Sequence, residues 1–241
     1  MQFFQLVLSC VCILRIGERM RQNCQSVKGQ LFYLSTQMLY CTHNMKTEIE
    51  AKFLNIDIKD VREKLKKIGA VMEYPERLMK RKVFDYPDNR LDKESAWVRV
   101  RDEGDSKITL SYKKLLDRSL HGTKEITLNV SDFEIMCDFL QACGFAVKSY
   151  QETKREKWTL GESEITIDTW PWIPTFVEIE SETEEEVHKV SKLLGFDWKK
   201  ALHGSVETAY QDLFDVTDNE IDHWEEITFT PVPDWLEIKR K

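Results

Sequence analysis

Two pairs of glutamates occupy alternate positions of two short segments, one near residue 50 and one near residue 180. Glu48 and Glu50 belong to TEIEAKF, and Glu178 and Glu180 belong to TFVEIES; in both segments charged and apolar residues alternate. A period of two is typical of a β-strand, so each pair falls on one face of its strand, about 7 Å apart. At an effective dielectric constant of about 20, the two charges repel by roughly 2 kcal/mol. Two such strands side by side would form a four-carboxylate site suited to a hard divalent cation.

Basic residues alternate in the same way in segments between the two acidic ones. The segments WVRVR, ITLSYKK and KREKW place them at Arg99, Arg101, Lys113, Arg155 and Lys157. Lys113, rather than Lys114, shares the parity of Thr109 and Ser111 and therefore belongs to the polar face. Like charges at alternate positions stabilise a strand little, so their recurrence predicts a ligand of complementary charge. A polyanion accompanied by a metal cation would complement both sets.

The elements that position these residues are mainly antiparallel strands. Alternating patterns predict strands at residues 47–53, 78–86, 97–101, 108–113, 124–130, 148–160, 164–170 and 175–181. Helical patterns predict helices at residues 58–68, 132–143, 183–194 and 205–214. The hairpin-length connections favour an α+β fold: an eight-stranded antiparallel β-barrel or strongly curved sheet, with helices packed outside and the charged face inside. For any single strand, the alternative is an ordinary sheet with a solvated polar face.

Composition sets limits on the class of protein. The 241 residues are enough for one large domain, and the formal net charge of −7 does not fit a general nucleic-acid binder. Residues 3–16 form an apolar run that is shorter than the roughly 20 residues of a membrane span. We expect residues 1–44 to be an extension outside the fold, with a signal or membrane anchor as the alternative. Cys137 and Cys143, which follow this segment, lack metal-ligand spacing, and this favours a reduced, cytoplasmic setting.

The motifs together resemble the CYTH family of triphosphate tunnel metalloenzymes. This family includes class IV adenylyl cyclases, thiamine triphosphatases and inorganic triphosphatases. The matching motifs are, in chain order, the E-x-E-x-K of TEIEAKF, the R-x-R of WVRVR, the lysine after ITLSY, the glutamate of KEITL, the basic pair of KREKW, the aspartate of ITIDTW and the E-x-E of FVEIES. The resemblance implies a tunnel domain at residues 45–215, with the substrate inside, followed by a C-terminal tail at residues 216–241.

The resemblance also implies a role for each charged residue. The acidic residues that bind or support the metal, Mg²⁺ or Mn²⁺, are Glu48, Glu50, Glu178, Glu180, Asp168 and Glu125. The residues that hold the triphosphate are Lys52, Arg99, Arg101, Lys113, Arg155 and Lys157, because arginine and lysine complement phosphate oxygens. Glu50 and Lys52 take part in catalysis, and Trp97, which precedes the arginine pair, is the candidate for stacking on an organic group of the substrate.

Three functions remain open from the sequence. The leading hypothesis is metal-dependent hydrolysis of inorganic tripolyphosphate or of an organic or nucleoside triphosphate. The alternatives are a class IV adenylyl cyclase, which forms cyclic AMP and pyrophosphate, and a non-catalytic polyphosphate-binding module. Val83 replaces a tyrosine of the thiamine triphosphatases, and Lys114 and Leu115 replace a glycine-proline of the cyclases, so the substrate stays open. We expect a small-molecule triphosphate as partner and neither nucleic acid nor membrane, unless residues 1–44 are an anchor; a homodimer is left open.

Overall fold

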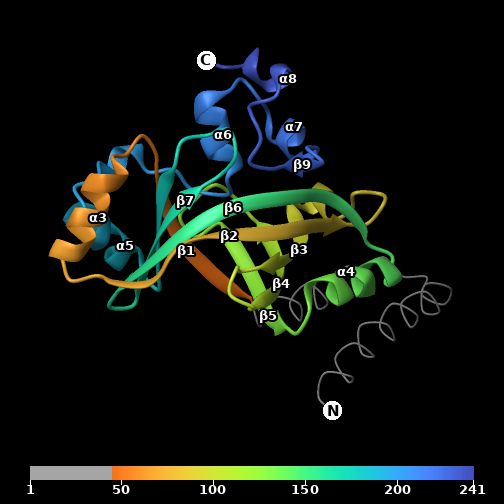
Figure 1. Ribbon diagram of the computed structural model, residues 1–241, viewed down its shortest axis with the longest axis horizontal. Coiled ribbons are helices and arrows are strands. Elements are labelled where there is room, and N and C mark those ends of the chain that lie inside the picture. The colour runs from red at the N-terminus through yellow and green to blue at the C-terminus, as the bar shows by residue number, and fades with distance from the viewer. Residues whose placement is uncertain (1–44) are drawn as a thin grey trace, which may run out of the picture. The chain divides into compact units, whose positions relative to one another are not determined.

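Eight strands form a closed antiparallel barrel. The computed structural model describes residues 45–241, of which Lys46–Lys241 form one compact unit. The strands are β1 (Lys46–Phe53), β2 (Val71–Asp85), β3 (Ala96–Asp102), β4 (Ile108–Leu115), β5 (Thr123–Val130), β6 (Ala146–Leu160), β7 (Ser163–Thr169) and β8 (Phe176–Ser181). Their order is β2-β3-β4-β5-β1-β8-β7-β6, and β6 pairs with β2 to close the ring (Figure 1). The predicted eight-stranded barrel with helices outside is confirmed.

The alternation of residue types separates the two faces of the wall. In β1, Glu48, Glu50 and Lys52 line the interior, whereas Ala51 and Phe53 pack outside against helices. The apolar outer face has to be covered because exposing it to water costs about 25 cal/mol per Å². The charged face is therefore enclosed by the barrel, as the sequence pattern predicted.

Strands β2 and β6 are longer than predicted. Strand β2 begins at Val71 instead of residue 78, and β6 begins at Ala146 instead of residue 148. The extra part of β2 contains Pro75 and pairs with β6 through register shifts on both sides of Tyr74. Proline removes a ladder hydrogen bond and is tolerated at such irregular positions. Tertiary pairing thus extends the strand through a segment whose sequence does not favour it.

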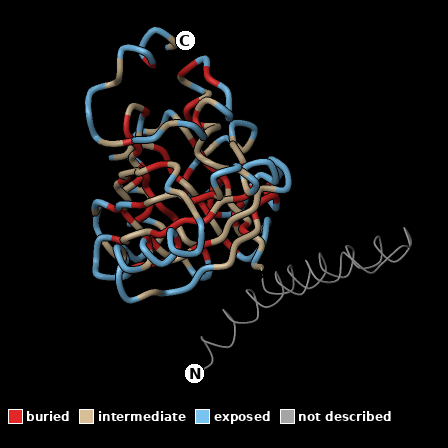
Figure 2. Tube along the Cα trace, turned by 90° about the vertical axis from the view of Figure 1, so that its right-hand side faces the viewer, coloured by how far each residue is buried: buried red, intermediate tan, exposed pale blue. Residues whose placement is uncertain are grey.

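Three helices cover the outside of the barrel, and side-chain acceptors fix where each begins. Helices α3 (Ile58–Lys67) and α5 (Glu184–Leu193) pack together on β1, β7 and β8, and α4 (Phe133–Ala142) covers β2, β3 and β4. Figure 1 shows α3 and α5 on one side of the barrel and α4 on the other. The side chains of Asp57, Asp132 and Thr183 accept backbone N–H groups of the first turns, as expected of N-cap residues. Figure 2 shows buried segments in the middle of this unit and exposed ones at its periphery.

The C-terminal segment closes over one end of the barrel. It contains α6 (Glu207–Leu213), α7 (Asp218–Asp222), β9 (Glu226–Ile227) and α8 (Asp234–Glu237), together with the short 3-10 helix η2 (Trp198–Lys200) before it; a second 3-10 helix, η1 (Asp92–Glu94), precedes β3. Strand β9 pairs in parallel with β6. Tyr210, Ile221 and Leu236 pack in one core cluster with Trp170 and Phe176, which belong to the barrel end. Residues 216–241 are therefore part of the same compact unit as the barrel.

The sequence predicts no association with a membrane unless residues 1–44 form an anchor. Between residues 45 and 241, the helices are all too short or too polar to cross a bilayer. The predicted extension or anchor, residues 1–44, lies outside the described residues.

Candidate active site

A cavity of about 1330 Å³ occupies the interior of the barrel. Every strand of the barrel contributes at least one charged side chain to its wall. These side chains include Glu48 from β1, Arg81 from β2, Arg99 from β3, Lys113 from β4, Glu125 from β5, Arg155 from β6, Glu164 from β7 and Glu178 from β8. The antiparallel pairing brings together residues that are more than a hundred positions apart in the chain.

An acidic row crosses three neighbouring strands. Glu50 of β1 is the register partner of Glu180 of β8, and Glu180 is the register partner of Glu164 of β7. Burial, and then the charges of Glu50 and Glu164, raise the pKa of Glu180 to about 7. Among the described residues, no cationic nitrogen lies within 4.0 Å of the Glu180 carboxylate. The row therefore contains a half-buried carboxylate, Glu180, without a direct cationic partner among the described residues.

Lys52 is held beside this row by two carboxylates and a carbonyl. Its Nζ lies 2.5 Å from Glu50 Oε1, 3.3 Å from Glu178 Oε1 and 2.5 Å from the carbonyl oxygen of Gly204. Lys52 is only 2% exposed. Desolvation lowers the pKa of Lys52, but Glu50 and Glu178 outweigh this effect and raise it above its ordinary value. Lys52 is thus a fixed positive charge at the end of β1.

A second lysine joins two further carboxylates. Lys113 Nζ donates to Glu48 at 2.7 and 2.9 Å and lies 3.7 Å from Glu125, which also faces Arg99 at 3.4 Å. Burial raises the pKa of Glu48 to about 8, despite the attraction of Lys113. Desolvation also acts on Glu125, but Lys113 and Arg99 hold the pKa of Glu125 below its usual value. The pair thus contains one carboxyl group that readily takes a proton and one that does not.

Comparison of the sequence with models of known protein families supports the resemblance that the motifs indicated. The model of the CYTH domain matches residues 46–208. The chain belongs to the CYTH family. CYTH proteins are triphosphatases or adenylyl cyclases and are generally metal-dependent.

Solved structures with the same fold include proteins from Vibrio and Pyrococcus. The putative adenylate cyclase from Vibrio parahaemolyticus superimposes with a TM-score of 0.61 at 15% identity, over 69% of this chain and 98% of that one. The PH1012 protein from Pyrococcus horikoshii gives a TM-score of 0.55 at 22% identity, over 64% and 93% of the two chains. A conserved hypothetical protein from Pyrococcus furiosus gives a TM-score of 0.54 at 22% identity, over 64% of this chain and 94% of that one. These similarities show the CYTH fold alone. No curated protein matches the sequence of the chain.

Most of the charged residues singled out from the sequence line the CYTH cavity, and one does not. Asp168 has the same parity as Glu164 but is only 1% exposed, because its two oxygens accept from Arg155 at 2.6 and 2.7 Å and one also accepts from Thr166. Arg155 Nη2 also donates to Glu178 at 2.8 Å. Asp168 therefore fixes the direction of Arg155 and is not itself open to the cavity.

The remaining predicted phosphate-binding residues are also ion-paired within the wall. Arg101 contacts Glu103 at 2.8 Å, and Lys157 lies 2.5 Å from Glu164 and 3.2 Å from Glu73. Partners of this kind keep each cation in place and leave its other N–H groups for a ligand.

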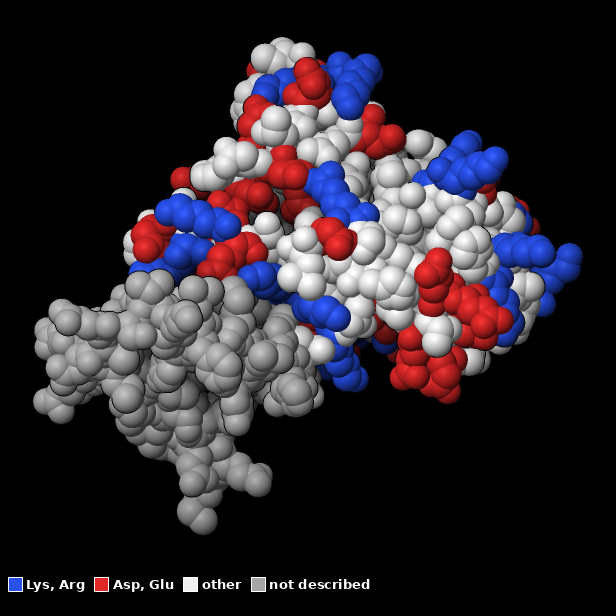
Figure 3. Space-filling model, turned by 180° about the vertical axis from the view of Figure 1, so that it is seen from behind, with Lys and Arg blue, Asp and Glu red and all other residues white. Residues whose placement is uncertain are grey.

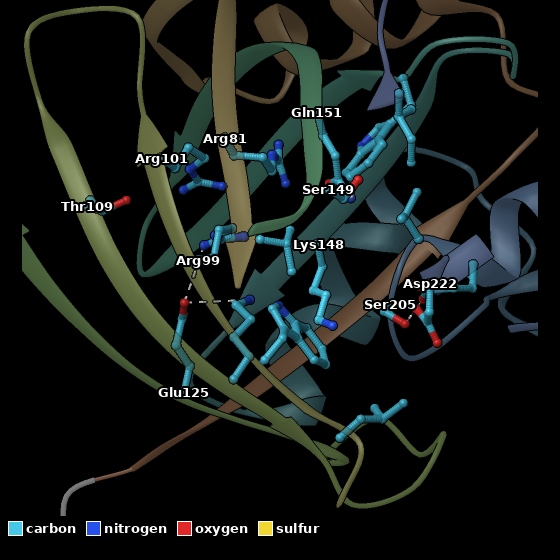
Figure 4. Close-up of a pocket in the computed structure, with 18 of the residues that line it drawn as sticks. Arg81, Arg99, Arg101, Thr109, Glu125, Lys148, Ser149, Gln151, Ser205 and Asp222 are labelled. Carbon is cyan, nitrogen blue, oxygen red and sulfur yellow. Dashed lines mark hydrogen bonds and ion pairs between the residues drawn. The ribbon is translucent and has the colours of Figure 1, made fainter. Parts of the chain in front are cut away.

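Trp97 lies at the end of the cavity that the C-terminal segment covers. It lines the cavity beside its register partner Lys113. Ser205 and Asp222 of the C-terminal segment line the same cavity, and Figure 4 shows them grouped on one side of it. Lys114 points out of the barrel and pairs with Glu94 at 2.9 Å. The parity that selected Lys113 for the interior is therefore correct.

Sequence reasoning did not select several cavity residues. Arg81 in β2 and Glu164 in β7 are charged, and Ser149 and Gln151 in β6 are polar. A signal existed for Glu164, which has the parity of Asp168, but not for Arg81, which lies between two other cations, Lys80 and Lys82. Figure 4 shows Arg81 beside Arg99 and Arg101, and Gln151 on the neighbouring strand β6 is the register partner of Arg81.

The carboxylates fit a divalent cation by their chemistry. Within residues 45–241, no three side chains of His, Cys, Asp or Glu are already arranged as a ligand set. Lysine nitrogens lie next to the carboxylates instead, as Lys52 does with Glu50 and Glu178. The donors are nevertheless hard oxygens, and Glu180 lacks a counter-charge next to Glu50. A small hard cation is the ligand that such a set favours.

Proposed function

We propose that the protein is a metal-dependent triphosphatase that hydrolyses inorganic tripolyphosphate or an organic triphosphate inside the barrel. The observation that carries this proposal is the enclosure of both charge types in one cavity, with Glu50 and Glu180 on β1 and β8 and Arg99 and Arg101 on β3. A metal-bound polyphosphate complements both. A solvated outer face would not need such a segregation of charges.

The metal is proposed to be Mg²⁺ or Mn²⁺, held by Glu50 and Glu180 with support from Glu48 and Glu178. When bound, it supplies charge neutralisation and activation of water. Glu50 is proposed as a catalytic residue because it touches Lys52 and is the register partner of Glu180, so it lies where metal and phosphate would meet. Asp168 takes no direct part in metal binding in this proposal and positions Arg155.

The basic side chains hold the phosphate chain. Lys52, Lys113 and Lys157 supply compact charges, and Arg99, Arg101 and Arg155 supply planar forks that match pairs of phosphate oxygens. Phosphoryl transfer depends mainly on such positioning and on stabilisation of charge, so no side-chain nucleophile is required. A wall of cations that are already ordered by ion pairs loses little side-chain entropy when the substrate binds.

The outer surface is consistent with a small-molecule substrate. On the face in Figure 3, basic and acidic side chains of the described residues are interspersed. The net charge of −7 also disfavours a nucleic-acid partner. We also propose a cytoplasmic location for the protein.

The test is a substrate panel. Tripolyphosphate, ATP and thiamine triphosphate are incubated with Mg²⁺, Mn²⁺ or EDTA, and orthophosphate, pyrophosphate and cyclic AMP are separated. We expect orthophosphate that depends on the metal. Cyclic AMP with pyrophosphate would instead assign the cyclase, and tight binding without turnover would assign a polyphosphate-binding module. Glu134→Gln is a suitable control, because Glu134 is on the exterior of α4 and pairs with Lys82.

A further inference from the structure

Arg81 is a buried cation that the roles described above leave unexplained. It lies on β2, lines the cavity and is 6% exposed. One guanidinium nitrogen, Nη2, donates to Thr153 Oγ1 at 2.6 Å, and the guanidinium carbon lies 4.7 Å from the centre of the Trp170 ring. Its Nε is buried and has no hydrogen-bond partner among the described residues. The side chain is thus anchored at one nitrogen and leaves donors free.

The charge of Arg81 is also uncompensated. In the part of the chain that the structure describes, no carboxylate lies within 4.0 Å of Arg81, whereas Arg99, Arg101 and Arg155 each have at least one. The register partner of Arg81 on β3 is Arg101, another cation. Burial, followed by the charges of Arg101, Arg99 and Arg155, lowers the pKa of Arg81 well below its ordinary value. A buried charge without a partner destabilises a protein, and an external anion would offset that cost.

The strand order places Arg81 opposite the acidic strand. Strand β2 is four strands from β1 in either direction around the closed ring, so the two strands form opposite walls. A substrate bound near Glu50 and Lys52 on β1 therefore faces Arg81 and Arg101 across the cavity. Figure 4 shows Arg81 and Arg101 next to each other, with Arg99 between them and Glu125.

We propose that Arg81 and Arg101 form a subsite for the terminal phosphoryl group of the substrate, on the wall opposite β1. This inference rests on the proposed function, because it assumes that the cavity binds a phosphate chain. The terminal group is the part of such a chain that carries up to two negative charges, and it suits two neighbouring guanidinium forks. Arg81 supplies the charge that is not already paired, so it sets the preference for a free chain end.

The test measures binding and stability separately. Wild type, Arg81→Met and Lys82→Met are titrated with inorganic tripolyphosphate in EDTA by calorimetry and melted without ligand. Lys82 is the matched control because it is next to Arg81 but faces outward, where it pairs with Glu134 at 2.9 Å. Arg81→Met should weaken tripolyphosphate binding by about 10- to 100-fold. It should also raise the melting temperature of the empty protein by about 2–4 °C, whereas Lys82→Met changes neither.

Cyclic trimetaphosphate, which has no chain end, is the second probe. It should bind wild type and Arg81→Met equally. The subsite is overturned if Arg81→Met binds tripolyphosphate as tightly as wild type does, or if it loses affinity equally for both probes. Unchanged binding with a lower melting temperature would mean that Arg81 has a purely structural role.

Arg81→Lys gives the same answer if Arg81→Met does not fold. Lysine keeps the charge but lacks the planar fork, so tripolyphosphate should bind several-fold more weakly; equal binding contradicts the subsite.

The experiment distinguishes failure of the subsite from failure of the proposed function. If wild type hydrolyses tripolyphosphate with a metal but binds it no better than Arg81→Met does, the proposed function stands and the subsite is rejected. If wild type binds tripolyphosphate with the expected dependence on Arg81 but forms no product, only the proposed enzymatic function is rejected.

Discussion

Replacing Glu180 by glutamine should stabilise the empty protein at neutral and alkaline pH. Burial, with Glu50 and Glu164 nearby, raises the pKa of Glu180 from its ordinary 4.5 to about 7. Because one pKa unit corresponds to about 1.4 kcal/mol, ionised Glu180 costs the folded state about 3 kcal/mol relative to the unfolded chain. Glutamine has nearly the same shape and carries no charge, so the variant avoids this cost.

The sign of the pH dependence follows from the direction of the pKa change. Below about pH 4.5 the carboxyl group is protonated in both states, and wild type and Glu180→Gln should differ little. Between pH 4.5 and 7 the folded wild type retains a proton that the unfolded chain has lost, so its stability falls as pH rises. Above pH 7 both states are ionised and the whole cost is present. The advantage of Glu180→Gln should therefore grow from near zero to about 3 kcal/mol.

Urea unfolding in EDTA at pH 4.5 and pH 8 measures this difference. Glu134→Gln is the control, because Glu134 is exposed on α4 and its substitution should give a small and nearly constant effect. Added Mg²⁺ or Mn²⁺ should raise the melting temperature of wild type at pH 8 more than that of Glu180→Gln. A variant that is less stable than wild type at pH 8, or whose advantage does not depend on pH, would refute the reasoning about the acidic row.

Three further variants test individual roles. Glu50→Gln should reduce metal-dependent phosphate release at least about 100-fold with little change in melting temperature, because it removes a proposed metal ligand; full activity rules out that role. Lys113→Met should weaken tripolyphosphate binding by about tenfold or more, whereas Lys114→Met, outside the barrel, should change it less than about twofold; equal effects contradict the parity argument. Trp97→Ala should raise KM for an organic triphosphate and leave KM for tripolyphosphate unchanged, and a parallel change in both means that Trp97 only packs.

The parts of the fold that were predictable are those in which charge and apolar character alternate strictly. In β1 and β8, glutamates alternate with Ile49, Ala51, Val177 and Ile179, so both the strand and its inner face follow from the sequence. The same holds for β4, where Thr109 and Lys113 line the cavity and Ser111, between them in parity, accepts from Arg99. Because the side-chain period of a strand is two, one correct residue fixes the parity of the whole strand.

Arg81 could not be placed with the same ease because β2 has no such contrast. The run Lys80, Arg81 and Lys82 puts cations on both faces, and only the register with β3 and β6 shows which one points inward. Upstream, the register shifts around Tyr74 break the alternation. The faces of β2 are therefore set by its neighbours and not by its own pattern.

The part of the C-terminal segment that follows α6 was not predictable for a different reason. Strand β9 has only two residues, which is too short for a periodic signal. Trp224 and Leu236 pack in the same cluster as Trp170 and Phe176, whose surroundings depend on the finished barrel. Packing of this kind depends on long-range contacts, so local sequence carries little information about it.

The pairing of β2 with β6 has a consequence for how the protein folds. These two strands are distant in the chain, and their contact closes the ring by placing Arg77 opposite Arg155, in the same wall as Arg81. Contacts between distant segments form slowly, and these also bring Arg81 close enough to Arg155 for the two cations to repel each other. A polyanion present during synthesis would reduce this repulsion, so the molecule that fills the barrel would also help to assemble it.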